Sequence, residues 1–394
     1  MMTFDNAEEL EKVARLHPDA ELPFYAVKCN TDLVLIRVLA SLGVGFDCAS
    51  REEIDIVMDM GVTADRIIYA NPCKTRSFIT HAKERNVTMM TFDNAEELEK
   101  VARLHPDAEM ILRIAVSDPT ATCPLNLKFG ADPVKDAPQL LVQAKQLGVE
   151  VIGISFHVGS GCNDPTAYRE AVAHARNLMD IGEGLGFCMK ILDMGGGYPG
   201  AAHHTSFQSV SSWVIFVGKL CNSGYMFQIA AVIRSAVDEF FPDSMGVRLI
   251  AEPGRFFAAA PFTLVCNVIH ATEVPADKIT KKPEDSEHRG YMYYINDGVY
   301  GSFNCILFDH VHPEGMPLFV GFCLNEIAEE YPTTIWGPTC DSLDKVEDKK
   351  HMRRLSIGDW IMYPNMGAYT CSASTTFNGF QRPTPIYVIG RENW

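Results

Sequence analysis

The chain has 394 residues, of which 47% are hydrophobic and 21% are charged, so it is long enough for two domains with cores of their own. Its net charge of −16 disfavours a nucleic-acid partner and suits a small-molecule substrate. The 12 cysteines are scattered, which indicates a reducing compartment such as the cytoplasm and disfavours a metal site or a disulfide framework. The sequence has no signal-peptide pattern and no long apolar run, so we expect no membrane span.

The first 21 residues recur without change at residues 89–109. A repeat that occurs once is not the period of a solenoid. An exon duplication or a gene-assembly error explains it better than a functional repeat does. The second copy fits its surroundings, so we treat residues 1–21 as a duplicated segment that supplies a surrogate N-terminal helix.

Short apolar segments and amphipathic segments then alternate along the chain. The apolar ones predict strands that are buried on both faces: Phe24–Lys28, Val44–Cys48, Arg66–Ala70, Val87–Phe92, Met110–Ile114, Val151–His157, Lys190–Met194 and Val247–Glu252. Helical spacing predicts the segments between them: Thr31–Leu42, Arg51–Met60, Arg76–Arg85, Asn94–Leu104, Val134–Leu147, Ala167–Gly184 and Ile229–Phe240. This alternation predicts a parallel (β/α)8 barrel of the TIM type, which we place at residues 22–262.

The pattern changes at residue 263, and residues 263–394 read as an all-β C-terminal domain. Short alternating segments predict its strands: Thr263–Ile269, Tyr291–Asn296, Asp359–Met362 and Ile386–Ile389. Between them, the charged segment Ala276–Arg289 reads as a surface loop. Two apolar stretches, Ser209–Gln228 and Leu318–Ile327, fit neither domain; they are either surface insertions or retained non-coding sequence.

Polar or glycine-rich features lie at the carboxyl ends of the predicted barrel strands. They are Lys28, Asp47, Asn71, Arg113, His157, the Gly195–Gly197 run and Glu252. The carboxyl ends of barrel strands form the active face of such folds. Lys28 by itself could cap a strand, and His157 by itself could be a core histidine. Their convergence on one face favours a functional site.

The residue types at this face describe a site for pyridoxal phosphate. A partly desolvated lysine such as Lys28 can capture an aldehyde as a Schiff base. The glycine run and the turn Glu252–Arg255, together with Ser160, can hold a phosphate. Glu252 can keep a pyridine nitrogen protonated, and the flat ring of His157 can stack on the cofactor. We expect no metal.

Motifs along nearly the whole chain strengthen this interpretation. They are PFYAVKCN at 23–30, FDCAS at 46–50, IIYANPCK at 67–74, SFHVGSGC at 155–162, LDMGGGYPG at 192–200, AEPGR at 251–255, NDGVYGSFNCILFDH at 296–310, WGPTCDSLD at 336–344 and NMGAYT at 365–370. With these motifs the chain resembles the eukaryotic ornithine decarboxylase family, within the alanine-racemase-like, fold-type III pyridoxal phosphate enzymes. The resemblance implies the same fold and the same cofactor.

The resemblance also implies roles for individual residues. Together with the strand ends, it leads us to expect cofactor contacts from Lys28, Asp47, Arg113, His157, Ser160, Gly196, Gly197, Glu252, Pro253, Gly254, Arg255 and Tyr369. Phe308, Asp309 and Asp341 correspond to substrate contacts. Cys340 corresponds to the residue that returns a proton to the carbon that loses carbon dioxide. The family site is shared across a homodimer, so Cys340 and Asp341 should act in the neighbour's site, and Lys128 and Asp344 match an ion pair across that interface.

We therefore expect pyridoxal phosphate-dependent decarboxylation of L-ornithine to putrescine and carbon dioxide, the first step of polyamine biosynthesis. One alternative is a non-catalytic antizyme-binding homologue of the antizyme inhibitor type. The segment Arg76–Glu99 matches the family's antizyme-binding region. Another is a catalytically defective product of a rearranged gene. Lysine and arginine remain alternative substrates, because the sequence predicts that the substrate is basic but predicts the length of its side chain less well.

Overall fold

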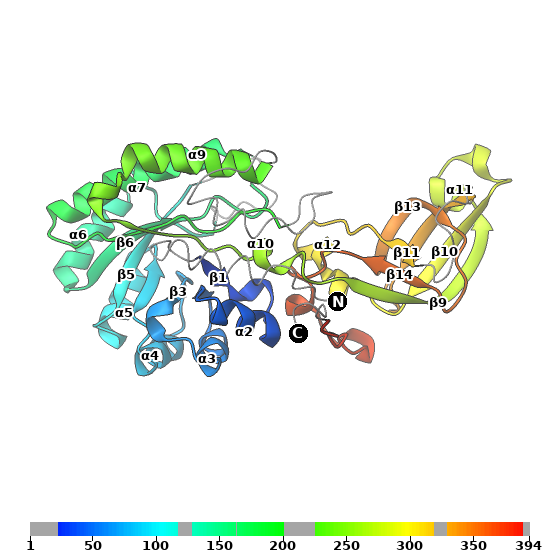
Figure 1. Cartoon of the computed structure of the whole chain (residues 1–394), viewed down its shortest axis with the longest axis horizontal. Coiled ribbons are helices and arrows are strands. Elements are labelled where there is room, and N and C mark those ends of the chain that lie inside the picture. Colours follow the sequence, from blue (N-terminus) through cyan, green and yellow to red (C-terminus); the bar gives the residue numbers. More distant parts are fainter. Residues whose placement is uncertain (1–22, 117–127, 163, 201–224, 319–328, 389–394) are drawn as a thin grey trace. The chain divides into compact units, whose positions relative to one another are not determined.

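The computed structural model describes residues 23–116, 128–162, 164–200, 225–318 and 329–388 (Figure 1). The duplicated segment 1–21 lies outside the described residues, as do most of Ser209–Gln228 and of Leu318–Ile327. The chain divides into two compact units, one ending at Phe257 and the other beginning at Ala258, and each is described by itself. Within the described residues, no helix combines the length and the apolar character that a membrane crossing needs.

The first unit is built on an eight-stranded parallel sheet whose strands follow one another in chain order (Figure 1). The strands are β1 (Phe24–Ala26), β2 (Gly45–Cys48), β3 (Ile67–Tyr69), β4 (Met89–Phe92), β5 (Glu109–Ile114), β6 (Glu150–Phe156), β7 (Ile191–Asp193) and β8 (Arg248–Ile250). The segment after β8 returns to β1, where the amide of Phe24 donates to the carbonyl of Ala251 at 2.8 Å. The sheet therefore closes on itself, which confirms the predicted barrel.

Helices connect these strands. They are α2 (Leu33–Ser41), α3 (Arg51–Asp59), α4 (Arg76–Glu84), α5 (Ala95–Leu104), α6 (Ala137–Leu147), α7 (Thr166–Gly184) and α9 (Tyr225–Phe240), with the short α10 (Arg255–Ala258) after β8. Polar side chains determine where several helices begin. Asp32 accepts hydrogen bonds from the amides of Val34 and Leu35 at the start of α2, and Asn94 accepts one from the amide of Glu97 at the start of α5.

Apolar side chains from the strands fill part of the unit's core. They form one buried cluster that consists of Phe24, Ile68, Met89, Ile111, Ile152, Ile191 and Ile250. Gly45 leaves room for the ring of Phe24, since a Cβ at this position would lie 2.8 Å from it. This packing fixes the strand ends in position, and those ends carry the polar residues of the site.

Two predicted strands of the barrel end two residues earlier than the sequence indicates. β1 ends at Ala26, and Lys28 lies in a 3-10 turn over Val27–Cys29, which the hydrogen bond from the amide of Asn30 to the carbonyl of Val27 closes at 3.1 Å. β8 ends at Ile250, two residues before Glu252. In both cases the predicted site residue lies on the turn that follows the strand.

The second unit contains a six-stranded sheet in the order β11-β14-β9-β10-β12-β13. These strands are β9 (Leu264–Pro275), β10 (Arg289–Ile295), β11 (Met316–Leu318), β12 (Glu330–Trp336), β13 (Lys345–Arg353) and β14 (Trp360–Tyr363). All neighbours are antiparallel except β10 and β12. The prediction of an all-β C-terminal region is thereby confirmed.

Two details of that prediction are wrong. No strand forms over residues 386–388, the described part of Ile386–Ile389, where only Tyr387 makes an isolated bridge. The segment Ala276–Arg289 contains the helical turn α11 (Asp277–Thr280), which buries Ile279, so it is more ordered than a surface loop. A further helical turn, α12 (Cys305–Phe308), follows β10. Little in the sequence indicates α11, because Ile279 is a single buried apolar side chain in a charged segment.

Candidate active site

Lys28 and Asp47 form an ion pair at the carboxyl ends of β1 and β2. The Lys28 side chain is 43% exposed, whereas the Asp47 side chain is fully buried. Oδ2 of Asp47 accepts from the lysine, while its Oδ1 is buried and takes no hydrogen bond from the described residues. The lysine is therefore held by a carboxylate at the mouth of the barrel and can still be reached.

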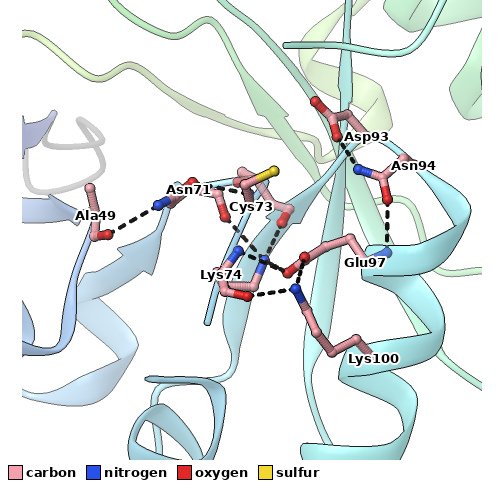
Figure 2. A network of polar contacts seen from close by, with 9 residues as sticks. Ala49, Asn71, Cys73, Lys74, Asp93, Asn94, Glu97 and Lys100 are labelled. Carbon is pink, nitrogen blue, oxygen red and sulfur yellow. Dashed lines mark hydrogen bonds and ion pairs between the residues drawn. The ribbon is translucent and has the colours of Figure 1, made fainter. Parts of the chain in front are cut away.

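Asn71 follows β3 and joins two neighbouring loops (Figure 2). Its Nδ2 donates to the carbonyl of Ala49 at 3.3 Å, and its Oδ1 accepts from the amide of Cys73 at 3.0 Å. The next residue, Lys74, is buried and pairs with Glu97 at 2.9 Å in the first turn of α5. Asn71 thus supports the loop after β2, and both polar atoms of its amide are occupied by the protein.

Glu252 lies beside a second buried carboxyl group, that of Asp193 at the end of β7. Burial raises the pKa of Glu252 well above its ordinary value, and the nearby charges of Asp193 and Asp47 raise it further. Burial likewise raises the pKa of Asp193 to about 7, while its hydrogen bonds to Gly195 and Glu252 act in the opposite direction. The two carboxyl groups therefore hold a proton near neutral pH.

Asp193 is a functional candidate that sequence reading missed. It is 1% exposed, and its Oδ1 accepts a hydrogen bond from the amide of Gly195 at 2.9 Å. The signal that could have found it is its place two residues before the glycine run, at the carboxyl end of a strand. The structure adds the burial and the contact with Glu252.

His157 directly follows β6 and is neutral in this setting. Burial lowers the pKa of its imidazole well below the ordinary value, and the positive charges of Arg113 and Lys28 lower it further. Its Nδ1 accepts a hydrogen bond from the amide of Gly159 at 3.0 Å, so the ring proton lies on Nε2. Arg113 belongs to β5 and lies over the ring of Phe129, 5.1 Å from its centre.

The glycine run after β7 passes too close to its neighbours for any other residue. At Gly196 a Cβ would lie 2.8 Å from Nε2 of His157, and at Gly197, where φ is +105°, it would lie 2.5 Å from the carbonyl oxygen of Gly159. The hydroxyl of Tyr168 donates to the carbonyl of Gly196 at 3.0 Å and holds the run in place. Sequence reading did not find Tyr168, which lies in the first turn of α7 without a motif.

The second glycine turn, Glu252-Pro253-Gly254-Arg255, lies in the same unit. Nη2 of Arg255 is 3.5 Å from Oγ of Ser160, so the structure brings this guanidinium and this hydroxyl together. A Cβ at Gly254 would lie 2.9 Å from Cβ of Cys29, next to Lys28. Pro253 receives a hydrogen bond at its carbonyl from the amide of Ala26 at 3.3 Å, which ties the turn to β1.

These residues fit pyridoxal phosphate. Three polar atoms, Asp47 Oδ1, Ser155 Oγ and Glu252 Oε1, are buried and have no hydrogen-bond partner in the described part of the chain. Native proteins rarely leave such atoms unpaired unless a ligand or water takes the bond. An accessible lysine, a neutral imidazole, an acid and a guanidinium near a hydroxyl match the aldehyde, ring face, ring nitrogen and phosphate of that cofactor.

The remaining predicted residues belong to the second unit. Phe308, at the end of α12, is 67% exposed, and Asp309 after it is 8% exposed. Cys340 is exposed, and Asp341 accepts hydrogen bonds from the hydroxyl of Tyr300 and the amide of Leu343. Tyr369 adopts a left-handed backbone conformation, with φ +53°.

The expected partners of the interface ion pair, Lys128 and Asp344, have contacts inside their own units. Nζ of Lys128 lies over the ring of Phe129, 4.8 Å from its centre. Asp344 is 1% exposed, and its two oxygens accept from the amide of Val299 and from the amide and hydroxyl of Thr339. Asp344 thus stabilises the loops of its own unit, a use that the resemblance did not indicate.

Comparison with known proteins gives consistent results. A family profile described as "Pyridoxal-dependent decarboxylase, pyridoxal binding domain" matches residues 20–259. Ornithine decarboxylase of Caenorhabditis elegans is 67% identical over 372 residues, which cover 94% of this chain and 82% of that protein. Antizyme inhibitor 2 of Xenopus laevis is 46% identical over 376 residues, 94% of this chain and 76% of that protein. The crystal structure of arginine decarboxylase from Paramecium bursaria Chlorella virus has a TM-score of 0.82 and 34% identity, with 97% of this chain and 93% of that chain covered.

Proposed function

This chain belongs to the pyridoxal-dependent decarboxylase family, and from that membership we propose that it converts L-ornithine to putrescine and carbon dioxide, the first step of polyamine biosynthesis. The observation that carries the proposal is the 67% identity to an ornithine decarboxylase over 94% of the chain. The barrel mouth supports it with a lysine, a neutral imidazole and a buried acid gathered at the strand ends. The enzyme is a lyase that depends on pyridoxal phosphate.

The barrel residues would hold the cofactor in distinct ways. Pyridoxal phosphate, when bound, supplies an aldehyde for the substrate amine and a ring that accepts the electron pair of the breaking bond. Lys28 would hold the aldehyde carbon, and Glu252 would hold a proton at the ring nitrogen. His157 would pack on the ring face. For the phosphate, we assign Ser160, Gly196, Gly197, Gly254, Arg255 and Tyr369.

Residues of the second unit complete the reaction. Loss of carbon dioxide from ornithine breaks one carbon–carbon bond and requires one proton at the same carbon. The exposed thiol of Cys340 supplies that proton. The carboxylates of Asp309 and Asp341 pair with the distal ammonium of ornithine, with Phe308 beside them.

The shared site requires a second copy of the chain. Two large apolar side chains near the Cys340–Asp341 pair are exposed. Leu343 lies two residues after Asp341 and is 63% exposed, and Phe377 precedes Asn378, which contacts Cys340, and is 43% exposed. Exposed apolar groups of this size favour burial against another protein surface. We assign the homodimer to this surface, with Cys340 and Asp341 acting in the neighbour's site.

The likeness to antizyme inhibitor 2 favours one second candidate, a protein that binds antizyme without catalysis. The segment Arg76–Glu99 would carry this binding, whether or not the chain is an enzyme. Its helix α4 exposes Arg76, Thr80, Lys83 and Glu84. The nine cysteines recorded in the described residues form no disulfide, which suits the reducing conditions of the cytoplasm.

Because one similar structure is an arginine decarboxylase, the preferred length of the substrate side chain has to be measured. The assay compares carbon dioxide release from ornithine, lysine and arginine by the purified chain loaded with pyridoxal phosphate. Ornithine should give the highest kcat/KM. A faster reaction with either longer substrate would contradict the ornithine assignment.

The roles of Lys28 and Cys340 are tested together. Lys28→Ala should lose the visible absorbance of the lysine-bound cofactor. Cys340→Ala should keep that absorbance and lose putrescine formation. A chain that binds the cofactor and antizyme but releases no carbon dioxide would establish the second candidate. A chain that binds neither would be a defective product of a rearranged gene.

A further inference from the structure

Two loops of the second unit are fastened to each other by one buried carboxylate. Asp344 accepts from the amide of Val299 at 2.8 Å and from the amide and hydroxyl of Thr339 at 2.9 and 2.6 Å. A Cβ at Gly298 or at Gly337 would lie 2.1 or 2.2 Å from its Oδ1, so both loops touch this side chain. The loop that carries Tyr300 and the loop that carries Cys340 and Asp341 are therefore held at a fixed distance.

Across these loops, Tyr300 contacts Asp341 directly. The hydroxyl of Tyr300 donates to Oδ2 of Asp341, and the amide of Leu343 donates to its Oδ1 at 2.9 Å. The Tyr300 bond is the largest cause that lowers the pKa of Asp341. Both oxygens are thus oriented by the protein, and the group stays an anion that can meet a cation.

A third segment, the turn at Thr375–Gly379, holds both loops. Thr375 donates to the carbonyl of Tyr300 from its amide at 2.8 Å and from its hydroxyl at 3.1 Å. The ring of Phe377 lies 4.4 Å from the ring of Tyr300. In the same turn, Oδ1 of Asn378 accepts from the amide of Cys340 at 3.3 Å.

We propose that Tyr300 and Asn378 are positioning residues for the substrate: Tyr300 aims the carboxylate of Asp341 at the distal ammonium, and Asn378 holds the backbone that carries the thiol of Cys340. The inference rests on the proposed function. The geometry separates the two effects, because Tyr300 acts on the group that binds substrate and Asn378 on the group that supplies the proton. Tyr300 also fixes the position of the Asp341 carboxylate and so the distance at which this carboxylate meets the distal ammonium. It thereby contributes to selection of ornithine over lysine.

The first test replaces Tyr300 by phenylalanine in the cofactor-loaded enzyme. Tyr300→Phe keeps the ring against Phe377 and removes only the hydroxyl that orients Asp341. We expect KM for ornithine to rise about tenfold, as for loss of one charge-assisted hydrogen bond, with little change in kcat. The ratio of kcat/KM for ornithine to that for lysine should fall.

A matched control removes the same kind of bond elsewhere in the unit. The hydroxyl of Tyr331, at the start of β12, donates to Glu329 at 2.6 Å. Tyr331→Phe should leave KM and the ornithine-to-lysine ratio unchanged. If Tyr300→Phe behaves like this control, the role of Tyr300 is wrong.

The second test replaces Asn378 by glycine. Asn378 has φ +55°, a conformation that glycine also adopts freely, so Asn378→Gly removes the acceptor without forcing the turn to change. We expect kcat to fall by about tenfold at nearly constant KM, because the donor thiol is no longer held. Lys281→Gly, at φ +62° after α11, is the control for glycine in a left-handed position and should leave kcat unchanged.

The outcomes separate this inference from the function beneath it. A wild-type chain that forms no putrescine overturns both. An active wild-type chain with unchanged KM, substrate ratio and kcat in the two variants overturns the positioning roles alone. Equal losses for ornithine and lysine in Tyr300→Phe would indicate general loop damage and would also contradict the proposal.

Discussion

At the scale of single residues, the least usual feature is the buried carboxyl pair formed by Asp193 and Glu252. Two acids that share a buried site cannot both ionise without a large cost in free energy. The pair therefore keeps a proton at a pH where exposed carboxyl groups have lost theirs. This property suits a site that must keep a ring nitrogen protonated, and it makes the cofactor-free protein sensitive to pH.

Replacing Asp193 by asparagine should remove part of this sensitivity. Burial raises the pKa of Asp193 from 3.8 to about 7, so the folded state binds a proton that the unfolded chain releases. The stabilisation from this group is complete below the pKa of the unfolded chain and is lost as pH rises through the pKa of the folded state. Between about pH 4 and 7, the free energy of unfolding of cofactor-free Asp193→Asn should fall less steeply than that of the wild type, with a difference of about 1–4 kcal/mol.

Denaturant titration of the cofactor-free proteins at several pH values measures this difference. Asp59→Asn serves as the control, since the side chain of Asp59 is 74% exposed. Its curve should run parallel to that of the wild type. Parallel curves for Asp193→Asn as well would show that Asp193 does not hold the proton.

At the scale of elements, the ends of the strands are stabilised by polar contacts behind the site. Lys74 donates to the carbonyls of Asn71 and Thr91 at 3.1 and 2.6 Å and pairs with Glu97, while Lys100 approaches the same glutamate (Figure 2). The network joins the loop after β3 to β4 and to the start of α5. A buried ion pair is stabilising only while both members are present.

Removing one member of this pair should therefore be costly. Lys74→Met leaves the Glu97 carboxylate buried with Lys100 as its nearest cation, and we expect a loss of about 3 kcal/mol in the free energy of unfolding. The double variant Lys74→Met/Glu97→Leu should recover much of that loss, because the buried carboxylate is gone and the ammonium of Lys100, whose side chain is 22% exposed, can be hydrated. Denaturant unfolding of both variants gives the comparison, and a double variant less stable than Lys74→Met would contradict the account.

At the scale of the whole molecule, the predicted site residues are divided between two units. The lysine, histidine and acids belong to the barrel, whereas Cys340 and Asp341 belong to the β-sheet unit. In the proposed homodimer, each site takes Lys28 from one subunit and Cys340 from the other. A mixed dimer of two different defective subunits can then still have one complete site.

Mixing two inactive variants tests this arrangement. Lys28→Ala and Cys340→Ala should each be inactive alone. Reassociated in equal amounts, half of the dimers combine the two variants and carry one intact site, so about a quarter of the wild-type activity should return. The measurement is putrescine formation after mixing under conditions that exchange subunits. No recovery, with subunit exchange demonstrated, would mean that Lys28 and Cys340 act within one chain.

The sequence by itself determined the barrel, the all-β region and the strand ends at which the proposed site residues lie. Strand periodicity and the strand-end residues depend on local patterns, and Lys28, His157 and Glu252 lie one or two residues after the strands that those patterns predict. The role expected for Cys340 came from the resemblance alone, because no local pattern distinguishes this residue from the other cysteines among the 12.

Only the tertiary structure decided which groups share a charge or a proton. Asp193 becomes a proton holder because folding buries it beside Glu252, and Tyr300 orients Asp341 because Asp344 joins their loops. Lys28 stands on a turn instead of in the strand because a backbone hydrogen bond closes there. The physical reason is common to all three: burial and through-space contact join residues far apart in the chain, and a sequence pattern reports only on neighbours along it.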